Sequence, residues 1–306
     1  MASLPLAGLK PASLATAHST IAGLGIHLPV QAPEAEVRTS EPDGVVHRIT
    51  GDRGATTPWL AAGAARAALQ ASGLRPSEIQ LVVVGTTSPD VLWPSTACLV
   101  QTELGLGMVP SFDLYAAEAG LLTAVAVADR FVRSGTPAAL VIGAESDRQL
   151  VDLPRQSGMG HGRAASAVVL ARTQGQDGIL ASIAGGAAGP DRSSHSAIAD
   201  VEAAVHACLS AAGIRLADCG LVIGEQTAPE VTRAWAAAAG IEKERLLLDP
   251  ARYRIAFAAA PLIALHDAVA DGRVQPGTIV LLLSCGTGPA WAATCLRWGK
   301  GKIAQW

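Results

Sequence analysis

The chain has 306 residues, 50% of them hydrophobic and 16% charged, so it is long enough for a large core in two domains or one large α/β unit. Its formal net charge of −3 gives no electrostatic reason to expect nucleic acid or an anionic membrane as a partner. No apolar run reaches the roughly 18 residues of a membrane span, residues 1–19 lack a secretory-signal pattern, and the five cysteines form no C-x-x-C pair, so we expect a cytoplasmic protein.

The N-terminal region gives helix signals after an irregular start. Residues 1–17 are predicted to be a poorly ordered lead-in. A helix is expected at about 59–72. Thr57 supplies its N-cap, Pro58 fits its first position, and Gly73 fits its C-cap.

The stretch 111–120 is predicted to be a buried strand that turns directly into a helix of small residues. Glu118 lies at the N-terminus of that helix, where backbone N–H groups and the helix dipole favour negative charge. A thiol at this position would become a nucleophilic thiolate, whereas a carboxylate is already an anion and a poor nucleophile. Whether the chain catalyses anything therefore depends on Glu118. A carboxylate that only caps the helix is the alternative interpretation.

An internal repeat organises the rest of the chain. The matching segments are 64–75 with 204–215, 81–84 with 221–224, and 129–143 with 267–283, the first two at a constant offset of 140 residues. Apolar strands that alternate with helices in this way predict sheets covered on both faces. Further strands are expected at 168–171, 178–184 and 290–296. We predict two halves, 18–185 and 186–306, joined by the Gly/Ser/Asp-rich segment 185–196.

Several motifs fall in order along the chain and carry a family resemblance. They are Gly85-Thr86-Thr87-Ser88-Pro89-Asp90, Trp93-Pro94-Ser95-Thr96-Ala97-Cys98, Phe112-Asp113-Leu114-Tyr115-Ala116-Ala117, Ala126-Val127-Ala128-Asp129, Gly160-His161-Gly162-Arg163-Ala164, and Gly286-Thr287-Gly288 with Trp291. Over about residues 20–298 the chain resembles the ketoacyl synthase III family, acyltransferases that start fatty acid and some polyketide chains. The resemblance implies an α/β thiolase fold, duplicated in a five-layer αβαβα arrangement.

The resemblance also locates the positions of the family's catalytic residues. A cysteine takes the acyl group, and a histidine and an asparagine assist decarboxylation; the matching positions here hold Glu118, Glu225 and Arg254. A carboxylate does not readily form the acyl thioester, Glu225 lacks a neutral imidazole, and Arg254 is permanently cationic. Loss of all three groups points to lost chemistry. Because two buried carboxylates alone would repel, we expect Arg254 to pair with Glu118, Glu225 or both.

Three further assignments follow from the resemblance. Backbone N–H groups at Glu118 and near Thr287 would form an oxyanion hole. The loop with Trp93 resembles the family segment that reaches into the neighbouring subunit's acyl pocket; an ordinary interface aromatic is the alternative. Arg48 is the one retained candidate in the segment that grips coenzyme A in the family, and that segment lacks the family's tryptophan. We therefore expect no cofactor, and no metal site.

The remaining histidines and cysteines carry weaker signals. His206 and His266 lie within predicted helices and are interpreted as packing or surface groups. His161 lies in a glycine-rich turn, and a functional role for it stays open. Cys98 and Cys285 are interpreted as structural thiols rather than nucleophiles.

The leading hypothesis is a non-catalytic ketoacyl synthase III-like subunit. Thiolase-fold proteins of this type are dimers in which the strand before the catalytic turn pairs across the two-fold axis. We expect a heterodimer or heterotetramer with a cysteine-bearing ketosynthase paralogue, in which this chain shapes the partner's acyl pocket as a chain-length factor does. An acyl carrier protein is a further expected partner.

Two other hypotheses stay open. One is an enzyme that uses Glu118 for non-covalent decarboxylation, hydrolysis or acyl transfer on acyl thioesters. The other is a module that binds a carrier protein or an acyl thioester without turning it over.

Overall fold

The fold is given by a computed structural model, which describes residues 18–29, 35–38, 45–48, 55–146, 163–186, 194–224, 226, 229–285 and 290–304. At residues 35–38, 45–48, 194–200, 231, 254 and 255 it describes the backbone alone. The predicted lead-in, residues 1–17, lies outside the described residues.

Helices and strands alternate along the described chain. The strands are β1 (His18–His27), β2 (Ala35–Arg38), β3 (Val45–Arg48), β4 (Val82–Gly85), β5 (Ser111–Leu114), β6 (Ala138–Glu145), β7 (Ala164–Thr173), β8 (Gly178–Gly186), β9 (Leu221–Ile223), β10 (Leu246–Leu247), β11 (Ile279–Cys285), β12 (Ala290–Arg297) and β13 (Lys302–Ile303). The helices are α1 (Thr57–Ser72), α2 (Thr96–Glu103), α3 (Gly120–Arg133), α4 (Ser194–Ala212), α5 (Pro229–Ala238), α6 (Pro250–Tyr253) and α7 (Ala260–Ala270), with 3-10 helices η1 (Pro76–Glu78), η2 (Ala117–Ala119), η3 (Leu216–Asp218) and η4 (Arg254–Ala259). The strands expected near 170, 180 and 293 are thus confirmed as β7, β8 and β12.

Two sheets carry the fold and repeat one topology. The first runs β13-β1-β7-β6-β4-β5, and the second, read from its other end, runs β8-β12-β11-β9-β10. In each sheet three neighbouring strands are parallel and the remaining pairs of the repeated unit are antiparallel. The repeat seen in the sequence is therefore confirmed as two copies of one sheet order. β2 and β3 pair as a separate two-stranded sheet.

The division between the sheets differs from the predicted boundary after residue 185. β8 (Gly178–Gly186) pairs with β12 and so lies in the second sheet. By strand order β8 is the counterpart of β1, the first strand of the first sheet. Division by sheet therefore falls before Gly178, and the segment 185–196 connects β8 with α4 rather than one half with the other.

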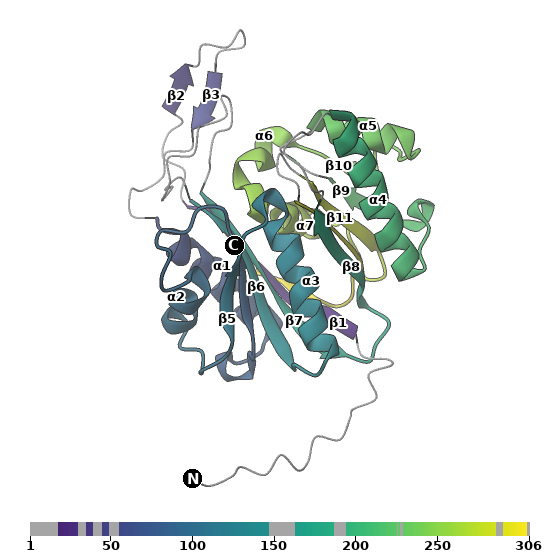
Figure 1. Ribbon diagram of the computed structural model, residues 1–306. Helices are drawn as coiled ribbons and strands as arrows, with labels where there is room; N and C mark the ends of the chain where they lie inside the picture. Colours follow the sequence, from purple (N-terminus) through teal and green to yellow (C-terminus); the bar gives the residue numbers. More distant parts are fainter. Residues whose placement is uncertain are drawn as a thin grey trace.

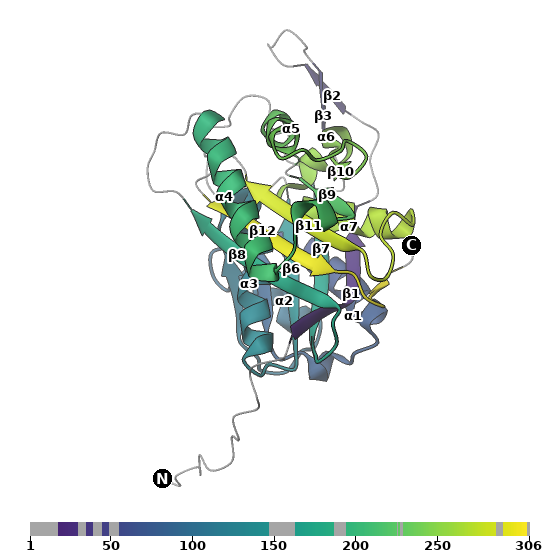
Figure 2. The same cartoon turned by 90° about the vertical axis from the view of Figure 1, so that its right-hand side faces the viewer.

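The elements stack in five layers, as the family resemblance implied. Figures 1 and 2 show α3 between the two sheets, α1 and α2 outside the first sheet, and α4 outside the second. α3 and α7 both contact strands of each sheet, and buried residues of both helices share one central hydrophobic cluster with β6 and β11. Separate clusters lie under α1 and under α4. No helix in the described part of the chain is long and apolar enough to span a membrane.

The start of α1 corrects one expectation. The N-cap is Thr56, whose hydroxyl accepts a hydrogen bond from the Trp59 N–H at 3.3 Å, so the prediction of Thr57 as N-cap is wrong. Thr57 is buried, and its hydroxyl donates instead to the Ser88 carbonyl oxygen at 2.5 Å. Gly73 caps the other end with a φ of 72°, the left-handed conformation that favours glycine, as expected.

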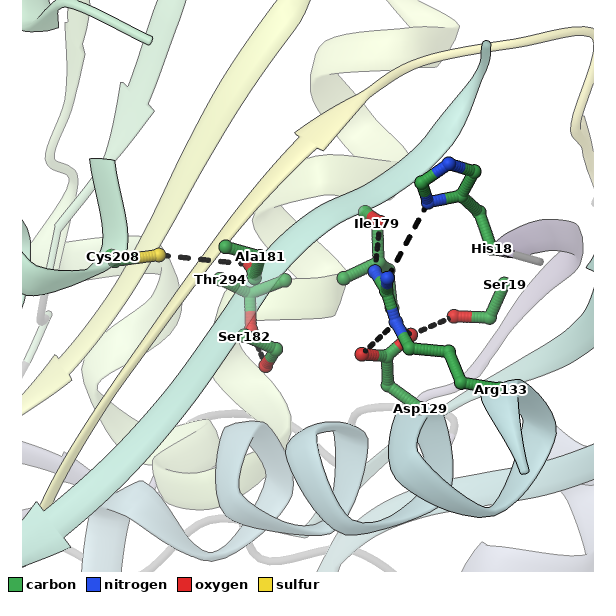
Figure 3. A network of polar contacts seen from close by, with 9 residues as sticks. All are labelled: His18, Ser19, Asp129, Arg133, Ile179, Ala181, Ser182, Cys208 and Thr294. Carbon is green, nitrogen blue, oxygen red and sulfur yellow. Dashed lines mark hydrogen bonds and ion pairs between the residues drawn. The ribbon is translucent and has the colours of Figure 1, made fainter. Parts of the chain in front are cut away.

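A buried ionic network ties the two sheets together through α3 (Figure 3). Asp129, which is 1% exposed, accepts hydrogen bonds from the Ser19 hydroxyl in β1 and from Arg133 Nε at 2.8 Å. Arg133 Nη2 donates to the Ile179 carbonyl oxygen in β8 at 2.7 Å, and its Nη1 lies 3.4 Å from His18 Nδ1. Because β1 and β8 belong to different sheets, the network fixes one sheet against the other.

Candidate active site at the turn between β5 and α3

The chain turns sharply where β5 passes into α3, and residues 116–120 are hereafter the elbow. Ala117 adopts a positive φ of 47°, and η2 then runs directly into α3. A positive φ in a residue with a Cβ costs about 1–3 kcal/mol, a strain that is typical of functional sites. Two glycines let the backbones meet, because a Cβ on Gly85 would lie 2.5 Å from the Gly120 carbonyl carbon.

Glu118 lies in the elbow with 3% of its surface exposed. It belongs to the single turn η2, which precedes the first residue of α3, so its backbone lies at the N-terminal end of that helix. η2 contacts β11, β12 and η4, so the elbow lies in the central layer against the second sheet. The strand-to-helix turn expected from the sequence is therefore present.

β5 itself differs from the expectation of a buried strand. It is the edge strand of the first sheet, and all four of its residues are only half-buried. Asp113 of β5 accepts hydrogen bonds from the backbone N–H groups of Thr96 and Ala97 at 2.7 and 2.8 Å. This carboxylate thereby caps the N-terminus of α2 and holds it beside β5. The outer edge of β5 has no partner strand in the described chain.

The repeat produces a second, chemically different elbow in the other half. Phe257 in η4 adopts a φ of 42°, and its position is related to Ala117 by the same 140-residue offset. The residue that then corresponds to Glu118 is Ala258, which is fully buried. η2 and η4 contact each other, so the two elbows lie together in the central layer. Of the two, the first alone carries an ionisable side chain at this position.

Glu145, at the end of β6, is a buried acidic residue close to the elbow that the sequence reasoning missed. Its Oε2 accepts hydrogen bonds from the hydroxyls of Thr87 and Ser88 at 2.7 and 2.8 Å, and the Thr87 N–H donates to Oε1 at 3.0 Å. Burial raises the pKa of Glu145 to about 7; the bonds from Thr87 and Ser88 oppose this rise, and the charge of Glu118 adds to it. The elbow therefore has a second carboxyl group that changes its charge near neutral pH.

Further hydrogen bonds attach the segment after β4 to this carboxyl group. The Ser146 N–H donates to the Ser88 hydroxyl oxygen at 2.8 Å, and the Thr57 and Ser146 hydroxyls are hydrogen-bonded to each other at 2.8 Å. The Thr57 N–H donates to Asp90 Oδ2 at 2.5 Å. The start of α1, the end of β6 and the segment after β4 are thus held together by buried polar contacts.

Ser284, on β11, was also missed by the sequence reasoning. It follows Val280 and Leu282 on the strand face that belongs to the central cluster. Its hydroxyl is buried and has no hydrogen-bond partner among the residues that the structure describes. Two sequence signals existed: an acidic residue and a serine, each at the end of a long apolar strand. Neither signal could show that both strand ends reach the central layer.

Several predicted site residues fall outside what the structure describes. Glu225, Thr287 and His161 are not among the described residues, and neither are the side chains of Arg254 and Arg48. The expected ion pairs of Arg254, the oxyanion contact at Thr287 and the coenzyme A contact of Arg48 therefore stay predictions. No group of three or more His, Cys, Asp or Glu residues suited to a metal ion occurs among the described residues.

The remaining sequence candidates have clear places. Trp93 is 85% exposed on the loop that follows β4. Cys98, in α2, donates a hydrogen bond to the carbonyl oxygen of Ser111, at the end of β5 opposite the elbow. His206 lies on an exposed face of α4, and His266 is buried in α7 with its Nε2 3.0 Å from the Ala304 carbonyl oxygen.

All five cysteines of the chain lie in the described part, and their places limit the chemistry of the elbow. Four of them, Cys208, Cys219, Cys285 and Cys295, belong to the cluster under α4, on the outer face of the second sheet. The fifth, Cys98, bonds to the start of β5. The elbow thus presents a carboxylate and no thiol, so it can hold a proton or a negative charge but cannot form a thioester at residue 118.

Comparison with protein families now places the chain. The family model "3-Oxoacyl-[acyl-carrier-protein (ACP)] synthase III C terminal" matches residues 209–298, and "3-Oxoacyl-[acyl-carrier-protein (ACP)] synthase III" matches residues 112–188. A beta-ketoacyl-[acyl-carrier-protein] synthase III of Rhizorhabdus wittichii is 32% identical over 285 residues, covering 84% of this chain and 89% of that protein. One from Aquifex aeolicus is 32% identical over 261 residues, covering 79% and 84%.

Solved structures give the same result. The crystal structure of 3-oxoacyl-[acyl-carrier-protein] synthase III from Aquifex aeolicus matches with a TM-score of 0.80 and 30% identity, over 92% of this chain and 100% of that one. A variant of OleA from Xanthomonas campestris matches with a TM-score of 0.74 at 19% identity, over 92% and 98%, which shows the fold alone. With this fold and these relatives, the chain belongs to the 3-oxoacyl-[acyl-carrier-protein] synthase III family.

Proposed function

We propose that the chain is a non-catalytic ketoacyl synthase III-like subunit that pairs with a cysteine-bearing ketosynthase and shapes its acyl pocket, in fatty acid or polyketide type biosynthesis. The observation that carries the proposal is the buried Glu118 in the elbow. A carboxylate there stands at the position to which the family resemblance assigns the acyl-accepting cysteine. None of the chain's own thiols lies where it could replace that cysteine.

Glu118 also argues against a simple change of nucleophile. An acyl group on a carboxylate would be a mixed anhydride, which water hydrolyses readily and which holds the acyl group poorly. Covalent catalysis needs an activated nucleophile with a base in reach. The neighbouring ionisable group described at the elbow is another acid, Glu145, whose pKa burial raises and the charge of Glu118 raises further. Two carboxyl groups in one buried site are better suited to sharing a proton than to nucleophilic attack.

A surface beside the elbow supports the partner in this proposal. Three apolar side chains, hereafter the interface patch, follow the adjacent ends of β4 and of the edge strand β5 and are 58–85% exposed: Leu92, Trp93 and Tyr115. Exposed apolar side chains beside an edge strand that has no partner in the described chain are typical of a surface that another subunit covers. An interface on this side would bring Trp93 against the neighbouring subunit, where a large rigid side chain can limit the space for an acyl chain.

Co-expression with the ketosynthases encoded next to this chain tests the proposal. We expect a stable complex with a cysteine-bearing ketosynthase, and we expect Trp93→Ser to weaken it. Phe131→Ser is the matched control, because Phe131 is also exposed, at 43%, but lies in α3 away from the interface patch. Size-exclusion chromatography with mass detection measures the complex. Homodimers alone, with no complex in any co-expression, would contradict the proposal.

A second candidate function is favoured by one specific observation, the buried Glu145 beside Glu118. A carboxyl group whose pKa is raised to about 7, Glu145, next to a second carboxyl group suits general acid–base work on an acyl thioester, without a covalent intermediate. On this alternative the wild-type chain hydrolyses or decarboxylates malonyl or acyl thioesters by itself. Glu118→Gln would then lower kcat by a factor of about 100 or more. Full activity in that variant, or none in the wild-type chain, would exclude the alternative.

A further inference from the structure

The loop 86–95 links the buried carboxyl group of Glu145 to the exposed interface patch. Its first part carries Thr87 and Ser88, which contact Glu145 near the elbow. Its second part carries Leu92 and Trp93 of the interface patch, which are 75% and 85% exposed. Thr86 and Ser88 are buried, whereas Thr87 is exposed and Leu92 and Trp93 lie on the surface, so this short stretch of backbone runs from the interior to the surface.

Three hydrogen bonds anchor the inner end of this loop to a single carboxyl group. The donors are the Thr87 N–H, the Thr87 hydroxyl and the Ser88 hydroxyl, and all three donate to Glu145. Hydrogen bonds to an ionised carboxylate are about twice as strong as bonds between neutral groups. All three contacts therefore hold the loop more tightly when Glu145 is charged than when it is protonated.

We propose that Glu145 is a positioning residue that couples the charge at Glu118 to the tightness with which the loop 86–95 is held. A negative charge at Glu118 favours the protonated form of Glu145 and thereby weakens the anchor. Neutralising Glu118 favours the ionised form and tightens the anchor. The coupling is independent of the proposed function, because it needs only the two carboxyl groups and the three donors.

The charged groups around Glu145 are few in the described chain. Glu118 faces it from η2, and Asp90 lies further along the same loop, attached to Thr57. From β7, the buried Arg163 precedes Ala164, the residue opposite Glu145 in the sheet. From η4, Arg254 begins the packed segment, and its side chain lies outside the described residues.

The pKa of Glu145 sets the direction and range of the effect. Burial and the charge of Glu118 raise that pKa to about 7, against the opposing bonds from Thr87 and Ser88. While Glu145 stays buried, the loop is therefore held more tightly above about pH 7 than below it, even though ionisation of this carboxyl group lowers the stability of the folded chain as a whole. By thermodynamic reciprocity, a partner that fixes the loop at the interface patch favours the ionised form of Glu145. Occupation of the interface and the charge of the elbow thus influence each other.

Hydrogen–deuterium exchange of the loop tests the coupling. The backbone N–H of Thr87 is itself one of the three donors, so its exchange reports directly on the anchor. Exchange is followed by mass spectrometry from pH 5.5 to 8.5 on the full chain, and rates are corrected for the intrinsic effect of pH. We expect protection of peptides covering 86–95 to rise by roughly fivefold with increasing pH, because charge assistance adds about 1 kcal/mol. The midpoint is expected near 7.

Three variants separate coupling from a merely structural role. Glu118→Gln removes the neighbouring charge but keeps the shape, so the midpoint is expected to move to lower pH. Ser88→Ala removes one donor, so the midpoint is expected to move to higher pH. Asp90→Asn is the control, because Asp90 is the acidic residue of the loop itself and bonds to the Thr57 N–H rather than to Glu145. The pH midpoint of this variant is expected to equal that of the wild-type chain.

Two results would overturn the proposal. One is loop protection that does not change with pH in the wild-type chain. The other is a wrong response of the variants: the pH midpoint of loop protection does not move in Glu118→Gln, or it disappears in Asp90→Asn. Glu145→Gln is expected to give pH-independent protection at the low-pH level; if that variant does not fold, the Glu118→Gln and Ser88→Ala variants still decide the question.

Discussion

The two halves of the chain share a sheet order but not a chemistry. Each half turns through an elbow with a strained positive φ, at Ala117 in one and at Phe257 in the other. The first elbow presents Glu118, and the residue at the same place in the second is Ala258. The backbone of the turn is therefore a property of the repeated topology, whereas the ionisable group is a property of one half. Differences between the halves locate the function better than their shared features do.

The largest expected effect separates Gly85, which packs against the first elbow, from Gly224, which follows a strand of the second sheet. Gly85→Ala would place a Cβ 2.5 Å from the Gly120 backbone, which cannot move without moving α3, so we expect a loss of about 3 kcal/mol or more in unfolding free energy. At Gly224, after β9, a Cβ would meet the Thr232 side-chain methyl group at 2.3 Å. The cost of Gly224→Ala is therefore expected to be relieved by Thr232→Ser. Denaturant unfolding of all three variants measures this, and equal costs with no relief would break the comparison.

A second prediction compares the acidic residues of the two central helices. Asp129 in α3 is 1% exposed and binds Ser19 and Arg133, so Asp129→Asn should cost about 3 kcal/mol by leaving Arg133 without its buried partner. Asp267 in α7 is 9% exposed, accepts a hydrogen bond from the Tyr253 hydroxyl at 2.8 Å, and pairs at 2.8 Å with Arg252, whose side chain is 60% exposed and so contributes little. Asp267→Asn should cost about 1 kcal/mol. Thermal unfolding ranks the two variants, and a larger loss at Asp267 would contradict the role of α3 as the tie between the sheets.

A third prediction concerns the pH dependence of stability, which Glu145 in the first half should dominate. The pKa of Glu145 is raised in the folded chain from 4.5 to about 7, so the folded state binds more protons than the unfolded state between these values. Stability should therefore fall as pH rises from about 4.5 to 7, by at most about 3 kcal/mol, and level off above. Glu145→Gln should remove this fall. Unfolding free energies measured every half pH unit test it, and an unchanged slope in the variant would assign the titration to another group.

The smallest expected effect lies at the grooves beside α1 and α4. In the first half a groove of about 440 Å³ is bounded by an ion pair, in which Arg66 Nη2 lies 2.5 Å from Glu103 Oε1. The groove at the equivalent place in the second half is larger, about 850 Å³, and is lined by Trp235 and His206. Because both charged side chains are exposed, Glu103→Gln should cost less than about 1 kcal/mol. A larger loss of unfolding free energy, measured by denaturant unfolding, would contradict the weak contribution expected of an exposed ion pair.

Local sequence signals predicted much of this fold. The repeat, the strands and the small-residue helix after β5 follow from periodicity, and Gly73 marked the end of α1 because a left-handed C-cap favours glycine. The prediction of Thr57 as N-cap was wrong, because its hydroxyl bonds instead to the Ser88 carbonyl oxygen, a contact between segments distant in the sequence.

The candidate site was predicted less completely than the fold. Glu118 was found because one short motif spans the strand and the turn. Glu145 was missed because its partners Thr87 and Ser88 lie 58 and 57 residues away in sequence. The half-buried state of β5 was missed because the sequence pattern of an apolar strand is the same at the edge of a sheet as in its interior.

Acyl loading tests the central claim most directly. This chain and its co-purified ketosynthase would be incubated together with acyl thioesters of coenzyme A and of acyl carrier protein, and the intact mass of each chain measured. We predict an acyl adduct on the partner ketosynthase and an unmodified mass for this chain, because its elbow holds Glu118 and no thiol. An acyl adduct on this chain, at Glu118 or at any of its five cysteines, would contradict the account.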